Sequence, residues 1–226
     1  MISQEINDRP FKYKYFKHVW LVLIAVAYLI AFFVIERLIP NDYPADKMFL
    51  SHIPFDDKIP FWPWMIIFYA AWYPGLAVVG AYLMARDVRN FVRYMTYVGV
   101  TFFTMIILCV LFPNYQDMRP AITGDESVFT RILKGIYTAD TYTNVLPSGH
   151  VFGSFAIAIG VFSCKKLRKH IWLDIITVVI AVMISASTVF VKQHSVLDCI
   201  ASVPLSIMWY FVVYKFIFSE KKEKTA

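Results

Sequence analysis

A histidine and a carboxylate four residues apart, His194 and Asp198, form the first pattern in the sequence that could do chemistry. Residues at this spacing lie on one face of a helix. A carboxylate that binds one imidazole nitrogen holds the ring in a fixed tautomer and leaves the other nitrogen as a nucleophile or base. The pattern therefore predicts an oriented, reactive histidine at position 194.

A second histidine ends the stretch Pro147-Ser148-Gly149-His150. This stretch stands where a polar segment meets an apolar run, so we expect Ser148 and Gly149 at the N-terminus of a helix. Free backbone N–H groups at such a terminus attract anions. Two histidines beside an anion site, one of them oriented by an aspartate, indicate phosphoryl transfer. The remaining elements must bring the two stretches together.

Long apolar runs make up most of the chain. Of its 226 residues, 59% are hydrophobic and 18% aromatic, which is not the composition of an ordinary soluble domain. A membrane-crossing helix takes about 20 apolar residues. Six candidate runs lie at approximately 17–36, 62–84, 94–113, 149–164, 171–191 and 196–218, the fourth being short for a full span. We therefore expect an all-α, six-transmembrane-helix bundle, with residues 1–226 forming a single integral membrane domain.

The formal net charge of +6 is distributed unevenly along the chain. If the six runs alternate across a membrane, 15 of the 22 Lys and Arg residues fall with the two termini and the even-numbered loops, and 7 with the odd-numbered loops. Positive residues are retained on the cytoplasmic side. The pattern predicts a multi-pass protein of the plasma membrane with both termini cytoplasmic and the two histidine stretches extracytoplasmic. It also argues against nucleic-acid binding as the reason for the charge.

The outer loop over residues 114–147 is longer than most connections, which favours a functional segment. Within it, residues 127–138 have apolar positions at near-helical spacing. We expect a short amphipathic, extracytoplasmic interfacial helix there, capped by Ser127 or Asp125.

Two features of the outer segments leave alternatives open. The loop over residues 38–61 mixes aspartates with apolar residues, and it is either a plain connection or a substrate gate. Asp140 and Asn144 are turn-forming residue types that could equally contact a substrate. The histidines His18, His52 and His170 are expected to be interfacial residues at the ends of spans.

The motifs, taken in order, resemble those of the type 2 phosphatidic acid phosphatase superfamily. That family carries Lys-x6-Arg-Pro, then Pro-Ser-Gly-His, then Ser-Arg-x5-His-x3-Asp. The corresponding residues of this chain are Arg119-Pro120, the stretch 147–150, and Ser187 with His194 and Asp198. The resemblance covers residues 55 to 200 approximately, including the order and sidedness of the spans.

Two cations of the family pattern are absent. Phe112 stands where the first motif has lysine, and Thr188 where the third has arginine. We expect Lys192 to supply the missing charge, which requires the fifth span to stop near Val191 so that Lys192 and His194 can face one phosphate. The variant third motif looks like that of the branch related to inositol phosphorylceramide synthases, which includes enzymes that transfer the phosphoryl-bearing group to an alcohol.

The resemblance implies roles for the remaining site residues. His194 would attack phosphorus to give a phosphohistidine, with Asp198 holding its other nitrogen, and His150 would protonate the leaving oxygen. Arg119, with Ser148 and Gly149, would bind the phosphate oxygens. No metal and no cofactor is implied. The substrate would be a lipid phosphate or pyrophosphate: phosphatidic acid, phosphatidylglycerol phosphate or undecaprenyl pyrophosphate.

Two other functions remain as alternatives to a phosphatase. One is a lipid phosphotransferase of the inositol phosphorylceramide synthase type, which product analysis with and without an alcohol would distinguish. The other is a non-catalytic transporter or scaffold; a transporter should show internal repeats or paired broken helices, and the sequence has neither. The sequence makes no prediction of the oligomeric state.

Overall fold

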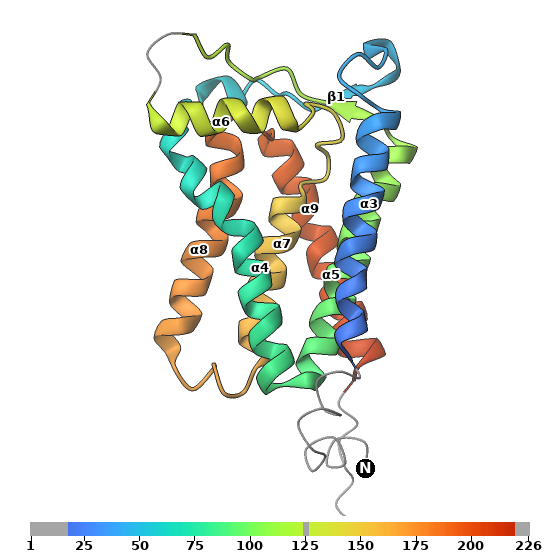
Figure 1. Cartoon of the computed structure of the whole chain (residues 1–226), viewed down its shortest axis with the longest axis vertical. Helices are drawn as coiled ribbons and strands as arrows, with labels where there is room; N and C mark the ends of the chain where they lie inside the picture. The colour runs from blue at the N-terminus through green and yellow to red at the C-terminus, as the bar shows by residue number, and fades with distance from the viewer. Residues whose placement is uncertain (1–17, 124–126, 220–226) are drawn as a thin grey trace, which may run out of the picture.

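Apolar runs of the sequence form long helices that lie side by side in a bundle (Figure 1). A computed structural model of the chain describes residues 18–123 and 127–219. The long helices are α3 (Leu23–Leu38), α4 (Ile66–Arg86), α5 (Val88–Leu111), α7 (Gly149–Ser163), α8 (Ile171–Phe190) and α9 (Val196–Tyr210). A shorter helix, α6 (Val128–Ala139), lies across one end of the bundle (Figure 1).

Within the described part of the chain, five helical segments are long and apolar enough to cross a membrane, so the chain is a multi-pass membrane protein. They are Trp20–Leu38, Pro63–Arg86, Val88–Leu111, Ile171–Phe190 and Val196–Ile217. The remaining helix α7, which corresponds to the fourth predicted span, has 15 residues and a length of about 22 Å, against about 30 Å for a bilayer core. The fourth apolar run is therefore as short as the sequence indicated, and five of the six expected spans meet the criteria of length and hydropathy.

Short elements extend or connect the long helices. The 3-10 turns η1 (Trp20–Val22) and η4 (Pro63–Met65) precede α3 and α4, and the π-helix η5 (Phe211–Ile217) continues α9. The loop after α3 contains η2 (Ala45–Lys47), β1 (Phe49–Leu50) and η3 (Asp56–Lys58). Strand β1 pairs in parallel with β2 (Asn114–Tyr115), which ties this loop to the one after α5. The fold is predominantly helical, as predicted, with this two-residue pairing as an unpredicted addition.

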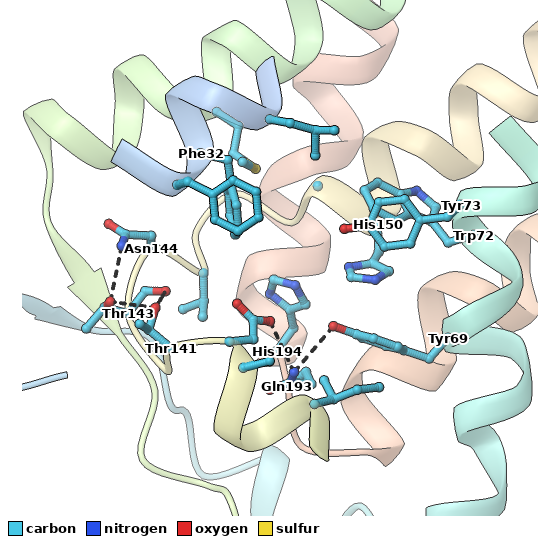
Figure 2. Close-up of a pocket in the computed structure, with 18 of the residues that line it drawn as sticks. Phe32, Tyr69, Trp72, Tyr73, Thr141, Thr143, Asn144, His150, Gln193 and His194 are labelled. Carbon is cyan, nitrogen blue, oxygen red and sulfur yellow. Dashed lines mark hydrogen bonds between the residues drawn. The ribbon is translucent and has the colours of Figure 1, made fainter. Parts of the chain in front are cut away.

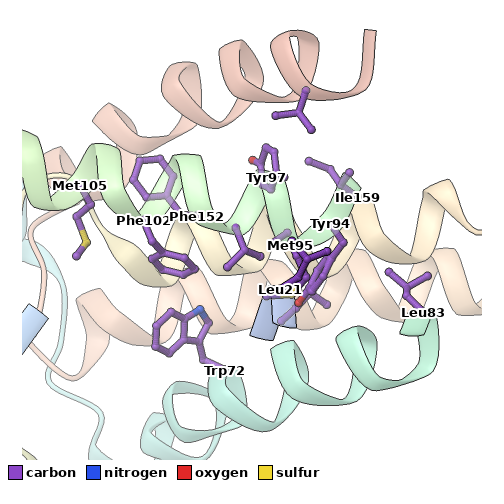
Figure 3. Close-up of a cluster of buried hydrophobic side chains, with 14 of the residues drawn as sticks. Leu21, Trp72, Leu83, Tyr94, Met95, Tyr97, Phe102, Met105, Phe152 and Ile159 are labelled. Carbon is purple, nitrogen blue, oxygen red and sulfur yellow. The ribbon is translucent and has the colours of Figure 1, made fainter. Parts of the chain in front are cut away.

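Helix α7 lies inside the bundle, where it packs against α4, α5, α8 and α9. A helix that is apolar on all faces is suited to such a position. Small residues permit the close approach: a Cβ built at Gly153 would lie 1.8 Å from Nε1 of Trp72, and one at Gly160 would lie 2.6 Å from Cγ1 of Val79. Trp72 belongs to the main core cluster, together with Phe102 and other aromatic residues (Figure 3).

The start of α3 and the end of η5 lie at the end of the bundle opposite α6 (Figure 1). Arg93, near the start of α5, donates a 2.7 Å hydrogen bond to the carbonyl of Phe218 at this end. The arrangement is compatible with an even number of crossings. Several of the basic residues counted in the sequence lie outside the described residues, and the orientation relative to the cytoplasm stays a prediction.

Helix α6 forms where the sequence predicted an amphipathic helix. Ser127 is its N-cap, accepting a 3.2 Å hydrogen bond from the N–H of Thr130, while the alternative cap, Asp125, lies outside the described residues. The placement of α6 at a membrane interface stays a prediction.

Candidate active site

The first turn of α9 fixes the orientation of His194. Ser195 is the N-cap, and its side chain accepts a hydrogen bond of 3.0 Å from the N–H of Leu197. In return, Oδ2 of Asp198 accepts one of 2.9 Å from the N–H of Ser195, which completes a capping box. The same oxygen is 3.2 Å from Nδ1 of His194. Asp198 thus holds the helix end and one ring nitrogen, leaving Nε2 of His194 for other partners.

The first turn of α7 places His150 opposite His194. Their ring centroids are 5.7 Å apart, and both side chains line one cavity (Figure 2). The His150 ring lies against Tyr69 and Trp72, with centroid distances of 4.2 and 4.5 Å. Its Nε2 is buried and has no hydrogen-bond partner among the described residues. The structure therefore brings together two histidines that are 44 positions apart in the sequence, one of them with an unpartnered nitrogen.

Arg119 lines the same cavity and also caps α6. Nη1 donates to the carbonyls of Tyr137 and Asp140, at 3.3 and 2.8 Å, and Nη2 donates to the carbonyl of Thr141. A cation at this position is favourable because the C-terminal carbonyls of a helix carry partial negative charge. Burial lowers the pKa of Arg119, and the neighbouring Asp140 carboxylate opposes that shift. Nε of Arg119 is buried and unpartnered in the described part of the chain, so it is a candidate donor to a ligand.

The two small residues before His150 have different positions. Gly149 lines the cavity, whereas Ser148 is fully buried beside it. The N–H of Ser148 donates to Oγ of Ser202 at 2.7 Å and lies 3.3 Å from the carbonyl of Asp198. The N–H of Ser148 therefore joins α7 to α9, while its hydroxyl has no hydrogen-bond partner among the described residues and its predicted role as a phosphate ligand stays a prediction.

A family model described as the PAP2 superfamily matches residues 91–222, more than half of the chain. The chain belongs to this superfamily. No curated protein and no solved structure matches the chain. The matched segment contains Arg119, His150, His194 and Asp198, the motif residues that form or support the cavity. Membership indicates a membrane phosphatase or a related lipid phosphotransferase.

Lys192, expected to replace the missing PAP2 cations, is directed elsewhere. Helix α8 ends at Phe190, as the sequence required, and Lys192 adopts a left-handed backbone with φ of 54°. Such a φ costs about 1–2 kcal/mol for a residue other than glycine. Nζ donates to the carbonyls of Asp56 and Ile59, both at 2.8 Å. The turn forms where expected, but it sends the Lys192 ammonium into the loop before α4 and away from the lining of the cavity.

The loop before α4 supports the site through a residue that the motifs did not identify. Asp56 is fully buried, and its carboxylate accepts from Oγ of Ser195 at 2.7 Å and from the N–H of Val196 at 2.8 Å. The sequence left open whether residues 38–61 are a plain connection or a substrate gate. The contacts of Asp56 give this loop a further role, since they position the start of α9. The buried aspartate has no local sequence signal that would distinguish it from the exposed Asp57.

The outer segment between α5 and α7 supplies two more supporting residues, Gln116 and, from α6, Tyr137. The last carbonyls of a helix lack intrahelical partners. At the end of α8, the hydroxyl of Tyr137 donates to the carbonyl of Val191 at 2.6 Å, and Nε2 of Gln116 donates to that of Lys192 at 3.2 Å. The long outer segment thereby holds the turn that carries His194.

One side of the PAP2 cavity is acidic. Asp140 lines it, and Nε2 of Gln193 lies 3.3 Å both from Oδ2 of Asp140 and from the hydroxyl of Tyr69 (Figure 2). Burial and the nearby Glu36 raise the pKa of Asp140 to about 6. Asn144 also lines the cavity; it has φ of 59° and donates to Glu36 at 3.1 Å, so it is a turn residue as well.

The cavity lining contains one Lys or Arg side chain, Arg119. Within residues 18–123 and 127–219, no group of three or more His, Cys, Asp or Glu residues is arranged to hold a metal ion.

His52, expected at the end of a span, lies instead in the loop before α4, where its ring contacts Asp57 and Asp117 at 2.9 and 2.8 Å.

Proposed function

We propose that this protein is a metal-independent phosphatase that hydrolyses a lipid phosphate or pyrophosphate through a phosphohistidine intermediate. The observation that carries the proposal is the facing pair of histidines: His194, held by Asp198, and His150, whose Nε2 has no partner among the described residues. Phosphatidic acid, phosphatidylglycerol phosphate and undecaprenyl pyrophosphate are the candidate substrates.

The reaction has two steps. Nε2 of His194 attacks phosphorus while the bond to the leaving oxygen breaks, and a protonated His150 transfers its proton to that oxygen. His150, now neutral, takes a proton from water as the water oxygen attacks the phosphohistidine, which releases phosphate and restores both histidines. Asp198 stabilises the positive charge that develops on the His194 ring. The two rings are close enough for one phosphoryl group to lie between them.

Arg119 and the first turn of α7 at Gly149 are the proposed ligands of the phosphate oxygens. Lys192 is removed from this set because its ammonium binds two backbone carbonyls. Thr188, at the motif position of arginine, directs its hydroxyl to the carbonyl of Ser185 at 2.8 Å. Arg119 is then the one Lys or Arg side chain of the cavity lining that can neutralise the phosphate.

The same charge distribution favours a second candidate, a lipid phosphotransferase. A dianionic monoester is poorly neutralised by Arg119 when Asp140 faces the same cavity. A phosphodiester carries one negative charge and fits this environment better. His194 would then carry the phosphoryl group with its remaining ester, and an alcohol would replace water in the second step.

The proposed location is the plasma membrane, with residues 1–226 as one domain and the cavity extracytoplasmic. A cysteine introduced at Ser127 should react with an impermeant thiol reagent applied to intact cells, and one at Lys166, in the turn after α7, should not. The reverse pattern would place the cavity on the cytoplasmic side.

The proposed activity is tested by phosphate release from the three candidate lipids, with and without an added alcohol. We expect release from at least one of them that persists in excess chelator and is absent for His194→Ala. If the added alcohol is converted to its phosphate ester and no free phosphate is released, the protein is a phosphotransferase. Failure to turn over any of the three lipids would contradict the phosphatase. Failure to transfer the phosphoryl-bearing group of a phosphodiester lipid to the alcohol would contradict the phosphotransferase.

A further inference from the structure

An apolar groove runs along the bundle between α3 and α4. Small residues of α4 form one wall, residues of α3 the other, and aromatic residues of α5 the floor. Residues that define it are Val22, Leu29, Ala77, Gly80, Ala81 and Tyr94. The groove exists because α3 and α4 each pack on α5 and have little contact with each other.

The groove adjoins the histidine cavity. Tyr28, Leu29, Trp72 and Tyr73 line both spaces, and Trp72 also contacts the ring of His150. From this junction the groove continues along α4 as far as Met84. Tyr73 and Met84 are eleven residues apart, which is about 16 Å along a helix. The groove therefore leads from the reactive groups toward the opposite end of the bundle.

The walls of the groove are almost entirely hydrocarbon. Its lining consists of aliphatic and aromatic side chains, and the hydroxyl of Tyr94 donates to the carbonyl of Leu76 at 3.0 Å. The other lining residues with a polar atom, Tyr28, Trp72 and Tyr73, are those shared with the histidine cavity. An apolar groove of this kind takes hydrocarbon. A second apolar groove, between α7, α8 and α9, shares no lining residue with the histidine cavity. Of these two grooves, the one between α3 and α4 is therefore the one that lies next to the histidines.

We propose that the groove between α3 and α4 binds one hydrocarbon chain of the substrate lipid while its phosphate lies between His150 and His194. This inference rests on the proposed phosphatase function and adds a binding site for the lipid chain to it. The small side chains of Ala77, Gly80 and Ala81 make the room for the chain, and Trp72 connects the chain site to the histidines. Recognition then depends on chain length as well as on phosphate.

The test compares a long and a short phosphate monoester, hexadecyl phosphate and butyl phosphate, on variants that fill one groove or the other. Ala77→Trp fills the proposed site, and Ala181→Trp fills the groove between α7, α8 and α9. Losing contact with two or more methylenes should lower kcat/KM for hexadecyl phosphate about tenfold or more in Ala77→Trp. Butyl phosphate should be affected less than about threefold, and Ala181→Trp should leave both substrates near wild type. Equal effects on the two substrates would overturn the proposal.

A second measurement does not depend on turnover. Hexadecyl phosphate with a diazirine in mid-chain should label peptides of α3 and α4 in wild type and in His194→Ala, and Ala77→Trp should reduce this labelling. Labelling confined to other lipid-facing helices would overturn the chain site even if the ester is hydrolysed. Labelling of α3 and α4 without hydrolysis of any phosphate ester would instead leave the chain site standing and contradict the proposed function.

Discussion

The hydroxyl of Ser195 donates a 2.7 Å hydrogen bond to the carboxylate of Asp56, 139 positions earlier in the chain. The same carboxylate accepts the N–H of Val196, so two donors at the start of α9 depend on one buried acid. Ser195 follows His194 directly in the chain. The contact with Asp56 therefore helps to position the proposed nucleophile from the distant loop before α4.

Asp56→Ala should therefore lower both stability and kcat. Three donors lose their acceptor, the hydroxyl of Ser195 and the N–H groups of Val196 and Ile53, at a cost of about 2–4 kcal/mol in total, which should appear as a lower Tm in detergent. Asp57→Ala is the matched control because that carboxylate is exposed and contacts His52 at the surface; it should change stability by less than about 0.5 kcal/mol. Equal behaviour of the two variants would contradict the positioning role of Asp56.

Lys192→Met separates a structural role from a phosphate-binding role. The carbonyls of Asp56 and Ile59 lose a charged donor, so Tm should fall, by the equivalent of about 1–3 kcal/mol. Inhibition by inorganic phosphate should change less than about threefold, because the ammonium does not line the cavity. Arg119→Gln, measured beside it, should weaken that inhibition about tenfold or more. Weaker inhibition in Lys192→Met at an unchanged Tm would restore Lys192 as a phosphate ligand.

Asp140 should make substrate binding depend on pH. With a pKa raised to about 6, its carboxylate is neutral below that pH and negatively charged above it, so KM for a phosphate monoester should rise as pH passes 6. The folded state also binds this proton more tightly than the unfolded chain, so this group favours folding at low pH and that contribution is lost as pH rises from about 4 to about 6.

The Asp140→Asn variant isolates this effect. A phosphate monoester itself titrates near pH 6, so the difference between wild type and variant is the informative quantity. We expect a lower KM for the variant at pH 7.5 and KM values that converge at pH 5. A KM that increases on Asp140→Asn at pH 7.5 would show that the carboxylate binds the substrate and does not repel it.

Gly153→Ala should disturb the site from inside the core. The added Cβ would lie 1.8 Å from Nε1 of Trp72, which must move, and Trp72 contacts the His150 ring. Overpacking of this kind costs about 1–3 kcal/mol, and we expect a loss in kcat of about tenfold or more. Gly135→Ala in α6 is the control, since its Cβ meets nothing within 4 Å; it should stabilise the protein by about 0.5–1 kcal/mol. Full activity of Gly153→Ala would show that Trp72 does not position His150.

Local patterns explain which parts of this structure were predictable from the sequence. Apolar runs marked the helices, and the four-residue spacing predicted the contact between Asp198 and His194, although His194 lies just before the N-cap of α9 and not on a face of that helix. The end of α8 was also predicted, from the requirement for a turn near Val191. These features depend on neighbouring residues, for which spacing is sufficient information.

Contacts between distant segments were not predictable in the same way. The left-handed φ of Lys192 decides the direction of its side chain, and no residue type in the sequence marks it, since glycine is the usual signal. The role of Asp56 and the hydrogen bond of the Ser148 N–H were not predicted, because their partners, Ser195 and Ser202, lie far away in the chain. The expectation that Lys192 lies beside the phosphate was therefore wrong, whereas the residues identified by the motifs do lie close together.

The most direct test of the proposed mechanism is to trap the covalent intermediate. The purified protein is mixed with a lipid phosphate radiolabelled in its phosphoryl group, quenched with alkaline denaturant within one turnover, and digested. A phosphohistidine is stable in base and labile in acid, and we expect the label on the peptide that contains His194. The His194→Ala variant should show neither label nor turnover. Undiminished phosphate release by His194→Ala, or turnover by wild type with the label on a different residue, would contradict the assignment of His194 as the nucleophile.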